Sequence, residues 1–506
     1  MLASLRTAAV YGVEACPVHV EVDVSFGLPS FRMVGLPDTT VRESRERVRL
    51  AIRNSGFEYP PHRITVNLSP ADLRKAGTSF DLPIALGILA ASGVVERRHI
   101  ADMVLLGELS LDGSVHATRG VLPIAVAARR DGMAGVLMPT ANANEAGIVD
   151  GLQVLAVSSL ADAVRALNGE PIPALPAPST HQSTLPAPPA LSAPFDLAEV
   201  RGQTLARRAL EVAAAGGHNL LLVGPPGAGK TMMARRLPGI LPPLGAEEAL
   251  DVTAVHSVAG VLPAGSGLIR DRPFRAPHHT ISNAALVGGG SIPRPGEVSL
   301  AHHGVLFLDE MLEFGRHVLE VLRQPLEEGR VMIARAARTT AFPARFMLVG
   351  AMNPCPCGFA GDPQRECRCT PQQVAHYRGK LSGPLRDRLD LTVEVAALPI
   401  EAMSDGCGEP SAAIRARVVA ARERQAQRLA GDALLTNAEL TPRLMTTYCA
   451  LSPPALRVLR AAAVRMTLSA RGYDRVRKVA RTIADLEGED GITADAIGEA
   501  LQYRML

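Results

Sequence analysis

A glycine-rich turn that ends in Lys230 and Thr231 is the strongest chemical signal in this sequence of 506 residues. It follows an apolar run over 219–223 and precedes helical spacing, which is the context in which such a turn binds phosphate. Backbone N–H groups close on the phosphate oxygens, the lysine reaches the β- and γ-phosphates, and the threonine hydroxyl ligates Mg²⁺. We expect nucleotide contacts from the whole turn: Gly224, Pro225, Pro226, Gly227, Ala228, Gly229, Lys230 and Thr231.

Two adjacent carboxylates, Asp309 and Glu310, complete the chemistry of this site. They follow an apolar run over 305–308, which predicts a buried strand that ends at the carboxylates. We expect Asp309 to hold Mg²⁺ and Glu310 to polarise the water that attacks the γ-phosphate. An Asp-Glu pair after a strand is common on protein surfaces, but its position downstream of the glycine-rich turn favours catalysis. The two motifs together predict hydrolysis of ATP with Mg²⁺.

Two more polar residues are expected at the nucleotide. A third apolar run, 346–351, is followed by Asn353, whose side-chain amide would orient water beside the γ-phosphate. The alternative is that Asn-Pro simply begins a turn. Lys478 would contact the nucleotide from the C-terminal region, where Arg471 and Arg475 compete for the same role.

Arg388 lies in a tight segment after a predicted helix. An arginine in such a position is suited to reach the γ-phosphate of a neighbouring subunit, as an arginine finger does. A salt bridge with Asp387 or Asp390 is the alternative.

Four of the seven cysteines crowd into one short segment: Cys355, Cys357, Cys367 and Cys369. They form two pairs separated by nine residues, enough chain to fold four sulfurs around one tetrahedral zinc ion. The single residue between the members of each pair is tighter than the usual spacing, so reduced, unligated thiols remain the alternative. Because four thiolates leave no open position, the predicted zinc is structural.

Two basic segments are candidates for DNA contact. Apolar residues alternate with other residues along 330–343, as in the strands of a β-hairpin, with Arg335 and Arg338 near its tip. Cations at such a tip can follow the phosphates of a nucleic acid without reading its bases; a solvated turn is the alternative. Arg275 belongs to a second candidate loop, beside the glycine-rich stretch 286–290.

The elements that must position these residues fall into four segments: a first α/β domain over 1–168, a proline-rich linker over 169–195, a core with a parallel sheet over 196–400 and a helical bundle over 401–506. In the first, short β-rich runs and helical stretches alternate: 18–24, 64–68, 103–106, 135–138 and 154–157 as strands, with 40–54 and 82–91 as helices. In the last, helical spacing occurs at 411–430, 453–467 and 475–487.

Composition excludes several classes of protein. With 47% hydrophobic residues the chain has material for more than one core, and its net charge of +3 is too small to indicate a nucleic-acid binder by itself. The longest apolar run, 82–95, is shorter than a membrane span. No secretory signal precedes the first domain, so we expect a cytoplasmic protein with no membrane contact.

Several long strings resemble the magnesium-chelatase-like AAA+ ATPases of the ComM/YifB type, nearly over the whole length: GLPDTTVRESRERVRLAIRNSGFEYPPHRITVNLSPADLRKAGTSFDLPIALGILAASG, FRAPHHTISNAALVGGG, NPCPCG and SARGYDRVRKVARTIADL. The resemblance implies an N-terminal domain with the Lon-protease/ribosomal S5 type of α/β fold, followed by a central AAA+ P-loop ATPase. It also implies a homohexameric ring and a role in DNA branch migration during natural transformation.

The Lon-like segment departs from the protease pattern. Ser79 matches the nucleophile, which a lysine on a later helix must activate. Leu122 occupies the lysine's position, and a leucine cannot accept a proton. We therefore expect a domain without proteolytic activity.

Three functions compete. A DNA motor with helicase activity is the leading interpretation, because the Lon-like domain and the cysteine cluster favour the ComM type. A magnesium-chelatase-type remodelling ATPase is the first alternative, and an ATP-dependent protease is the second. DNA-stimulated ATPase activity would separate the first from the other two.

Overall fold

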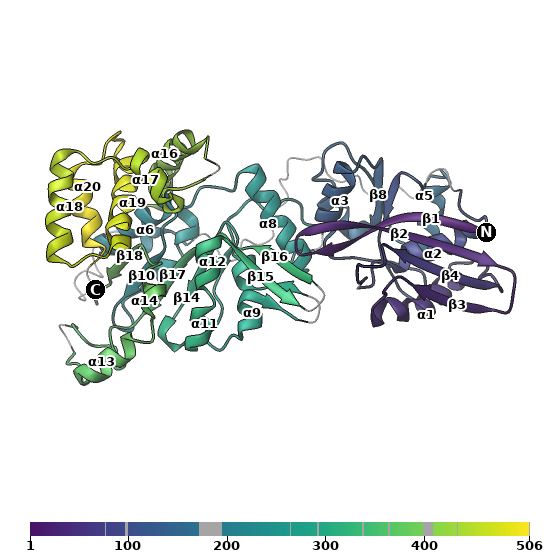
Figure 1. The fold of residues 1–506 in the computed structure, drawn as a ribbon, viewed down its shortest axis with the longest axis horizontal. Helices are drawn as coiled ribbons and strands as arrows, with labels where there is room; N and C mark the ends of the chain where they lie inside the picture. The colour runs from purple at the N-terminus through teal and green to yellow at the C-terminus, as the bar shows by residue number, and fades with distance from the viewer. Residues whose placement is uncertain are drawn as a thin grey trace.

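The computed structural model describes residues 1–75, 77–96, 100–171, 195–263, 265–290, 293–335, 338–362, 365–397, 408–432 and 434–504. Residues 172–194, most of the predicted linker, lie outside this range. Figure 1 shows the N-terminal domain at one end of the molecule, the five-stranded sheet in the middle and the C-terminal helices at the other end. Within the described ranges, no helix combines the length and the apolar character that crossing a membrane requires.

A mixed sheet forms the N-terminal domain. Its strands lie in the order β3 (Ser30–Val34), β4 (Arg63–Ser69), β2 (Glu14–Ser25), β1 (Leu2–Tyr11), β5 (Met103–Leu105), β8 (Gly135–Pro139) and β9 (Gln153–Val157). A short hairpin adds β6 (Glu108–Leu109) and β7 (Val115–His116). The helices are α1 (Thr39–Asn54), α2 (Asp81–Ala91), α3 (Val121–Arg130), α4 (Ala143–Ala146) and α5 (Leu160–Leu167). Every residue of α2 is buried, which explains why its sequence is apolar without periodicity.

The central sheet is parallel throughout, in the order β11 (Phe274–Arg275), β14 (Val305–Leu308), β17 (Met347–Met352), β10 (Leu220–Val223) and β18 (Leu391–Glu394). All residues of β10, β14 and β17 are buried, as expected for strands covered on both faces. Because the strands are parallel, the residues that follow β10, β14 and β17 meet at one edge of the sheet. The mixed and parallel sheets confirm the predicted α/β class.

Short helices connect the central strands: α6 (Thr204–Gly216), α7 (Lys230–Ala234), α8 (Ala246–Ala259), α9 (Asn283–Val287), α10 (Glu297–Leu300), α11 (Arg316–Glu320), α12 (Arg323–Glu328), α13 (Pro371–Arg378) and α14 (Gly383–Arg386). Two small hairpins join them, β12 (Gly288–Gly289) with β13 (Arg294–Pro295) and β15 (Arg330–Arg335) with β16 (Arg338–Pro343). The second hairpin is the one that the alternating sequence predicts.

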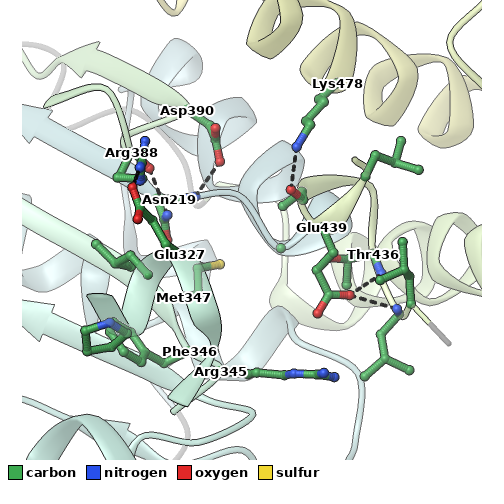
Figure 2. Close-up of a pocket in the computed structure, with 18 of the residues that line it drawn as sticks. Asn219, Glu327, Arg345, Phe346, Met347, Arg388, Asp390, Thr436, Glu439 and Lys478 are labelled. Atoms are coloured by element: carbon green, nitrogen blue, oxygen red, sulfur yellow. Dashed lines mark hydrogen bonds and ion pairs between the residues drawn. The ribbon is translucent and has the colours of Figure 1, made fainter. Parts of the chain in front are cut away.

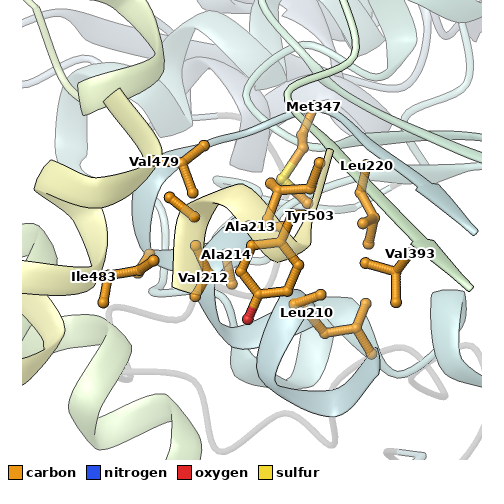
Figure 3. Close-up of a cluster of buried hydrophobic side chains, with 14 of the residues drawn as sticks. Leu210, Val212, Ala213, Ala214, Leu220, Met347, Val393, Val479, Ile483 and Tyr503 are labelled. Atoms are coloured by element: carbon orange, nitrogen blue, oxygen red, sulfur yellow. The ribbon is translucent and has the colours of Figure 1, made fainter. Parts of the chain in front are cut away.

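The C-terminal helices are α16 (Ser411–Leu429), α17 (Pro442–Tyr448), α18 (Pro453–Arg465), α19 (Ala470–Glu487) and α20 (Ala494–Gln502). They share one hydrophobic core with the central sheet. Figure 3 shows Tyr503 at the centre of this core, between Val479 of α19, Ala213 of α6 and Val393 of β18. The helical bundle is therefore packed directly on the sheet.

Among the described residues, the N-terminal and central domains are in contact at the β1–β2 turn and around α8. At the turn between β1 and β2, a Cβ added to Gly12 would lie 2.7 Å from the carbonyl oxygen of Ala341 in β16. Beside α8, the amide of Gly120 donates to the carbonyl of Ser257 at 3.2 Å, and the Ser257 hydroxyl donates to Glu145. The β15–β16 hairpin is thus in direct contact with the first domain.

Candidate nucleotide site

The glycine-rich turn joins β10 to α7 and depends on its glycines. Gly227 and Gly229 have φ angles of 82° and 88°, in the left-handed region that L side chains rarely adopt. Gly224 is required for a close approach, since a Cβ there would lie 2.1 Å from the carbonyl oxygen of Val395. This backbone turns sharply at the carboxyl end of the sheet, as in turns whose amides bind phosphate.

Lys230 connects the turn to Asn353. Its Nζ donates to the carbonyl oxygens of Gly224 at 2.6 Å and Pro225 at 2.8 Å, and to Oδ1 of Asn353 at 3.2 Å. The lysine is buried, and burial lowers its pKa, an effect that the charge of Asp309 partly offsets. The structure therefore brings the predicted phosphate-binding lysine and the predicted water-orienting amide together.

Thr231 and Asp309 also meet, because β14 and β10 end at the same edge of the sheet. The Thr231 hydroxyl donates to Oδ2 of Asp309 at 2.7 Å. A hydroxyl and a carboxylate are the hard oxygen ligands that Mg²⁺ prefers, so these two residues fit the predicted metal. Glu310 follows with an exposed side chain and a left-handed φ of 49°, and its amide donates to Oδ1 of Asp309.

His279 is a neighbour of Glu310 that the sequence analysis missed. Its Nδ1 lies 3.9 Å from Oε2 of Glu310, and its ring meets that of Phe314 edge to face. His279 follows β11, which lies beside β14 in the sheet. Since β11 has only two residues, Phe274 and Arg275, its sequence carries no strand signal that could have revealed this contact.

Arg388 and Lys478 line one pocket at the opposite edge of the sheet, together with Asn219, at the start of β10 (Figure 2). Arg388 forms an ion pair with Glu327, and its carbonyl accepts from Nδ2 of Asn219 at 2.8 Å. Lys478 donates to the carbonyl of Ala438 at 2.9 Å. Neither cation lies beside Lys230 of the same chain.

Burial is the main cause that lowers the pKa of both cations. For Arg388, the neighbouring charges of Arg471 and Arg475 act in the same direction. Arg475 itself pairs with Asp387 at 3.2 Å, the carboxylate that the sequence offered as an alternative partner of Arg388. Several arginines therefore crowd the edge of the sheet that faces away from the glycine-rich turn.

The predicted DNA-contacting residues have different surroundings. Arg275 is held by two hydrogen bonds to Glu297, at 2.7 and 2.8 Å, and this pairing raises its pKa. Arg335 and Arg338 are the last paired residues of the β15–β16 hairpin, as predicted. Their side chains lie outside the described part of the structure.

The remaining residues that the sequence singles out are the four clustered cysteines and the pair Ser79 and Leu122 of the domain expected to lack proteolytic activity. All four cysteine sulfurs of 355–369 lie within 4.8 Å of one another. In the N-terminal domain, Leu122 is buried in α3 and offers only its backbone amide, which donates to Glu145. The position where a protease of this type would carry a lysine therefore has no base for Ser79.

Family models cover most of the chain. The model described as "Magnesium chelatase, subunit ChlI" matches residues 196–403, "Subunit ChlI of Mg-chelatase" matches 20–142, and "Magnesium chelatase, subunit ChlI C-terminal" matches 408–504. Together with the parallel sheet and its glycine-rich turn, these matches define a magnesium-chelatase-like AAA+ protein.

The full-length relatives specify the type. "Competence protein ComM" of Haemophilus influenzae is 45% identical, over 100% of this chain and 98% of that protein. "Uncharacterized protein YifB" of Escherichia coli is 43% identical over 100% of this chain and 97% of that protein. An uncharacterized protein of Mycobacterium tuberculosis is 47% identical over 98% of this chain and 97% of that protein. The chain belongs to the magnesium-chelatase-like AAA+ family, in its ComM/YifB type, as the resemblance predicted.

Proposed function

We propose that the chain is an ATPase that assembles into a homohexameric ring and moves DNA strands, promoting branch migration during natural transformation. The observation that carries the ATPase is the meeting of Lys230, Thr231, Asp309 and Asn353 at one edge of the parallel sheet. The DNA substrate is supported by the full-length similarity to a protein named for competence.

Each residue of the site has a distinct task in hydrolysis. The amides of the glycine-rich turn and the Lys230 ammonium bind the phosphates, while Thr231 and Asp309 hold Mg²⁺. Mg²⁺ neutralises the charge that develops on the phosphate oxygens. Asn353 orients the attacking water, and Glu310, whose side chain is exposed to solvent, accepts its proton.

Arg388 acts between subunits in this proposal. The carbonyl of Arg388 is bonded to Asn219, at the amino end of β10, whereas the glycine-rich turn begins at the carboxyl end of that strand. A guanidinium at this edge is suited to the γ-phosphate of an adjacent subunit. Lys478 shares the pocket and would contact the same nucleotide. Completion of each ATP site therefore requires a neighbouring copy of the chain.

DNA contact is assigned to the β15–β16 hairpin. Arg335 and Arg338 end its paired strands, and β16 is followed by β17, the strand that leads to Asn353. Movement at the nucleotide is therefore linked to the hairpin through a short stretch of chain. Arg275 remains a further candidate, although it is already paired with Glu297.

The alternative is a remodelling ATPase like magnesium chelatase. The "Magnesium-chelatase 38 kDa subunit" of Cereibacter sphaeroides is 25% identical, but over only 40% of this chain. The competence protein matches the whole chain, N-terminal domain included. This difference in coverage favours the DNA motor.

ATP hydrolysis measured with and without forked DNA tests the proposal. We expect DNA to stimulate the wild type, and the double variant Arg335→Ala/Arg338→Ala to lose stimulation and strand displacement while it still binds ATP. Each lost phosphate contact should reduce the log-log salt slope of DNA binding by about 0.7–0.9. Arg330→Ala, at the base of the same hairpin, is the matched control. The proposed DNA motor would be refuted if DNA did not change the ATPase activity and if the double variant kept the wild-type salt dependence of DNA binding.

A further inference from the structure

The loop between β17 and α13 gathers four cysteines without help from regular structure. No helix or strand occurs among its described residues, 353–362 and 365–370. A connection of this length without its own secondary structure has few backbone hydrogen bonds to hold it. Its described residues bring the four cysteine sulfurs to within 4.8 Å of one another.

The distances between the sulfurs match a tetrahedral metal site. Sγ of Cys355 lies 3.3 Å from that of Cys357 and 3.7 Å from that of Cys367, and the Cys357 and Cys367 sulfurs are 3.6 Å apart. Zinc–sulfur bonds of about 2.3 Å at tetrahedral angles require sulfurs roughly 3.8 Å apart, whereas a disulfide requires about 2.05 Å. Cys369 completes the set of four.

Backbone amides are directed at the sulfurs as they are around bound thiolates. The Cys357 amide donates to Sγ of Cys369 at 3.4 Å, and the Ala360 amide donates to Sγ of Cys355 at 3.3 Å. Such donors stabilise negative charge on sulfur and fix the orientation of metal ligands. The loop between β17 and α13 thus provides both the four thiol ligands and backbone amides that hydrogen-bond to their sulfurs.

This loop also touches the glycine-rich turn of the candidate nucleotide site. Gly358 packs so closely on Pro226 that an added Cβ would lie 2.6 Å from the proline Cδ. Asn353, which accepts from Lys230, lies two residues before Cys355. On the far side, Nε of Arg378 in α13 donates to the carbonyl of Pro354 at 3.1 Å. The cysteine-containing loop between β17 and α13 therefore contacts α13 on one side and the glycine-rich turn on the other.

We propose that Cys355, Cys357, Cys367 and Cys369 bind one structural zinc ion, and that this zinc-bound loop positions the glycine-rich turn through the contact between Gly358 and Pro226. The zinc site stands independently of any activity. Its effect on nucleotide binding rests on the proposed ATPase function.

Metal content of the freshly purified, reduced full-length protein tests the site. We expect about one zinc per chain. Cys357→Ser and Cys369→Ser should each lose most of it, whereas Cys449→Ser, at a buried cysteine in the C-terminal region, should keep it. Protein depleted of zinc and reloaded with Co²⁺ should show the absorption bands of a tetrahedral tetrathiolate. This spectrum does not depend on the folding of a variant. Absence of zinc from the wild type, or a Co²⁺ spectrum without thiolate bands, would overturn the site.

The positioning role is tested with two glycine variants of the zinc-loaded protein. Gly358 and Gly361 have similar left-handed φ angles, 89° and 80°, so alanine strains the backbone equally at both. The nearest atom to a Cβ at Gly361 is Oε1 of Glu394, at 3.7 Å. We expect Gly358→Ala to weaken binding of a non-hydrolysable ATP analogue on the order of ten-fold or more, with zinc retained, and Gly361→Ala to leave it unchanged.

The zinc site and its positioning of the glycine-rich turn can each be refuted independently of the other. Equal losses in both glycine variants would show that strain, rather than the contact with Pro226, lowers affinity, and would overturn the positioning role. A wild type that holds zinc but binds no ATP analogue would refute the proposed ATPase and leave the metal site established.

Discussion

His302 makes the stability of the central sheet depend on pH. It lies just before β14, the strand that leads to Asp309 and Glu310, and its Nδ1 accepts from the amide of Arg345, just before β17. Burial lowers its pKa to about 3, and the charges of the adjacent His303 and of Arg345 act in the same direction, while the charge of Asp251 and the backbone hydrogen bond of Arg345 act against them. The neutral ring thus joins the starts of two strands.

The sign of the effect follows from the lowered pKa. An unfolded histidine titrates near about 6.5, so protons bind the unfolded chain before they bind His302 in the fold. The stability contributed by neutral His302 is complete above that pH and is lost progressively as the pH falls towards about 3. Between about pH 7.5 and about pH 5, the loss amounts to roughly 2 kcal/mol.

Hydrogen exchange of the β14 and β17 amides, corrected for the intrinsic pH dependence of exchange, measures this loss locally. In His302→Asn, the Oδ1 atom can accept from Arg345 without titrating in this range. The opening free energy of the wild type should therefore fall by roughly 2 kcal/mol more than that of the variant between the two pH values. His376→Asn, at an exposed position, is the control and should behave as the wild type. The same pH dependence in His302→Asn and the wild type would refute the reasoning.

Three further predictions concern activity. Lys230→Ala should abolish binding of a fluorescent ATP analogue, whereas Glu310→Gln should bind the analogue and hydrolyse ATP about 10²–10⁴-fold more slowly. Glu313→Gln is the control for the loss of a carboxylate. Normal ATP turnover by Glu310→Gln would contradict the role of Glu310 as the base. Arg388→Ala should keep its ATP affinity and lose hydrolysis, and mixing it with Lys230→Ala should restore part of the activity; without rescue, the arginine would act within one subunit. We expect no ATP-dependent peptide cleavage by the wild type, so Ser79→Ala should change nothing; cleavage that this variant abolishes would show that another group serves as the base.

Local motifs were predictable because a single stretch of chain determines them. The glycine-rich turn, the strand before Asp309 and the hairpin near Arg335 each follow from spacing alone. For α19, the predicted start at 475 was late. The helix begins at Ala470, because Ser469 caps it by accepting from the amide of Gly472, which offsets the low helical propensity of glycine.

Contacts between distant segments were not predictable, because they depend on strand order. The sequence does not indicate that β17 lies between β14 and β10, which is what brings Asn353 to Lys230. The pairing of Arg275 with Glu297 and the approach of His279 to Glu310 arise in the same way. The strands β1 and β3 were also missed. Every residue of β3 is at least partly exposed, so its apolar pattern is weak.

The contact of Gly12 with Ala341 connects the first domain to the β15–β16 hairpin. Any force that a ligand exerts on the β15–β16 hairpin reaches the β1–β2 turn, because the two backbones touch there. Strand β1 is paired with β2 over its whole length, from Leu2 to Tyr11, so the load spreads through the centre of a seven-stranded sheet. A hairpin supported in this way bends less under a given force than one that projects freely from its sheet.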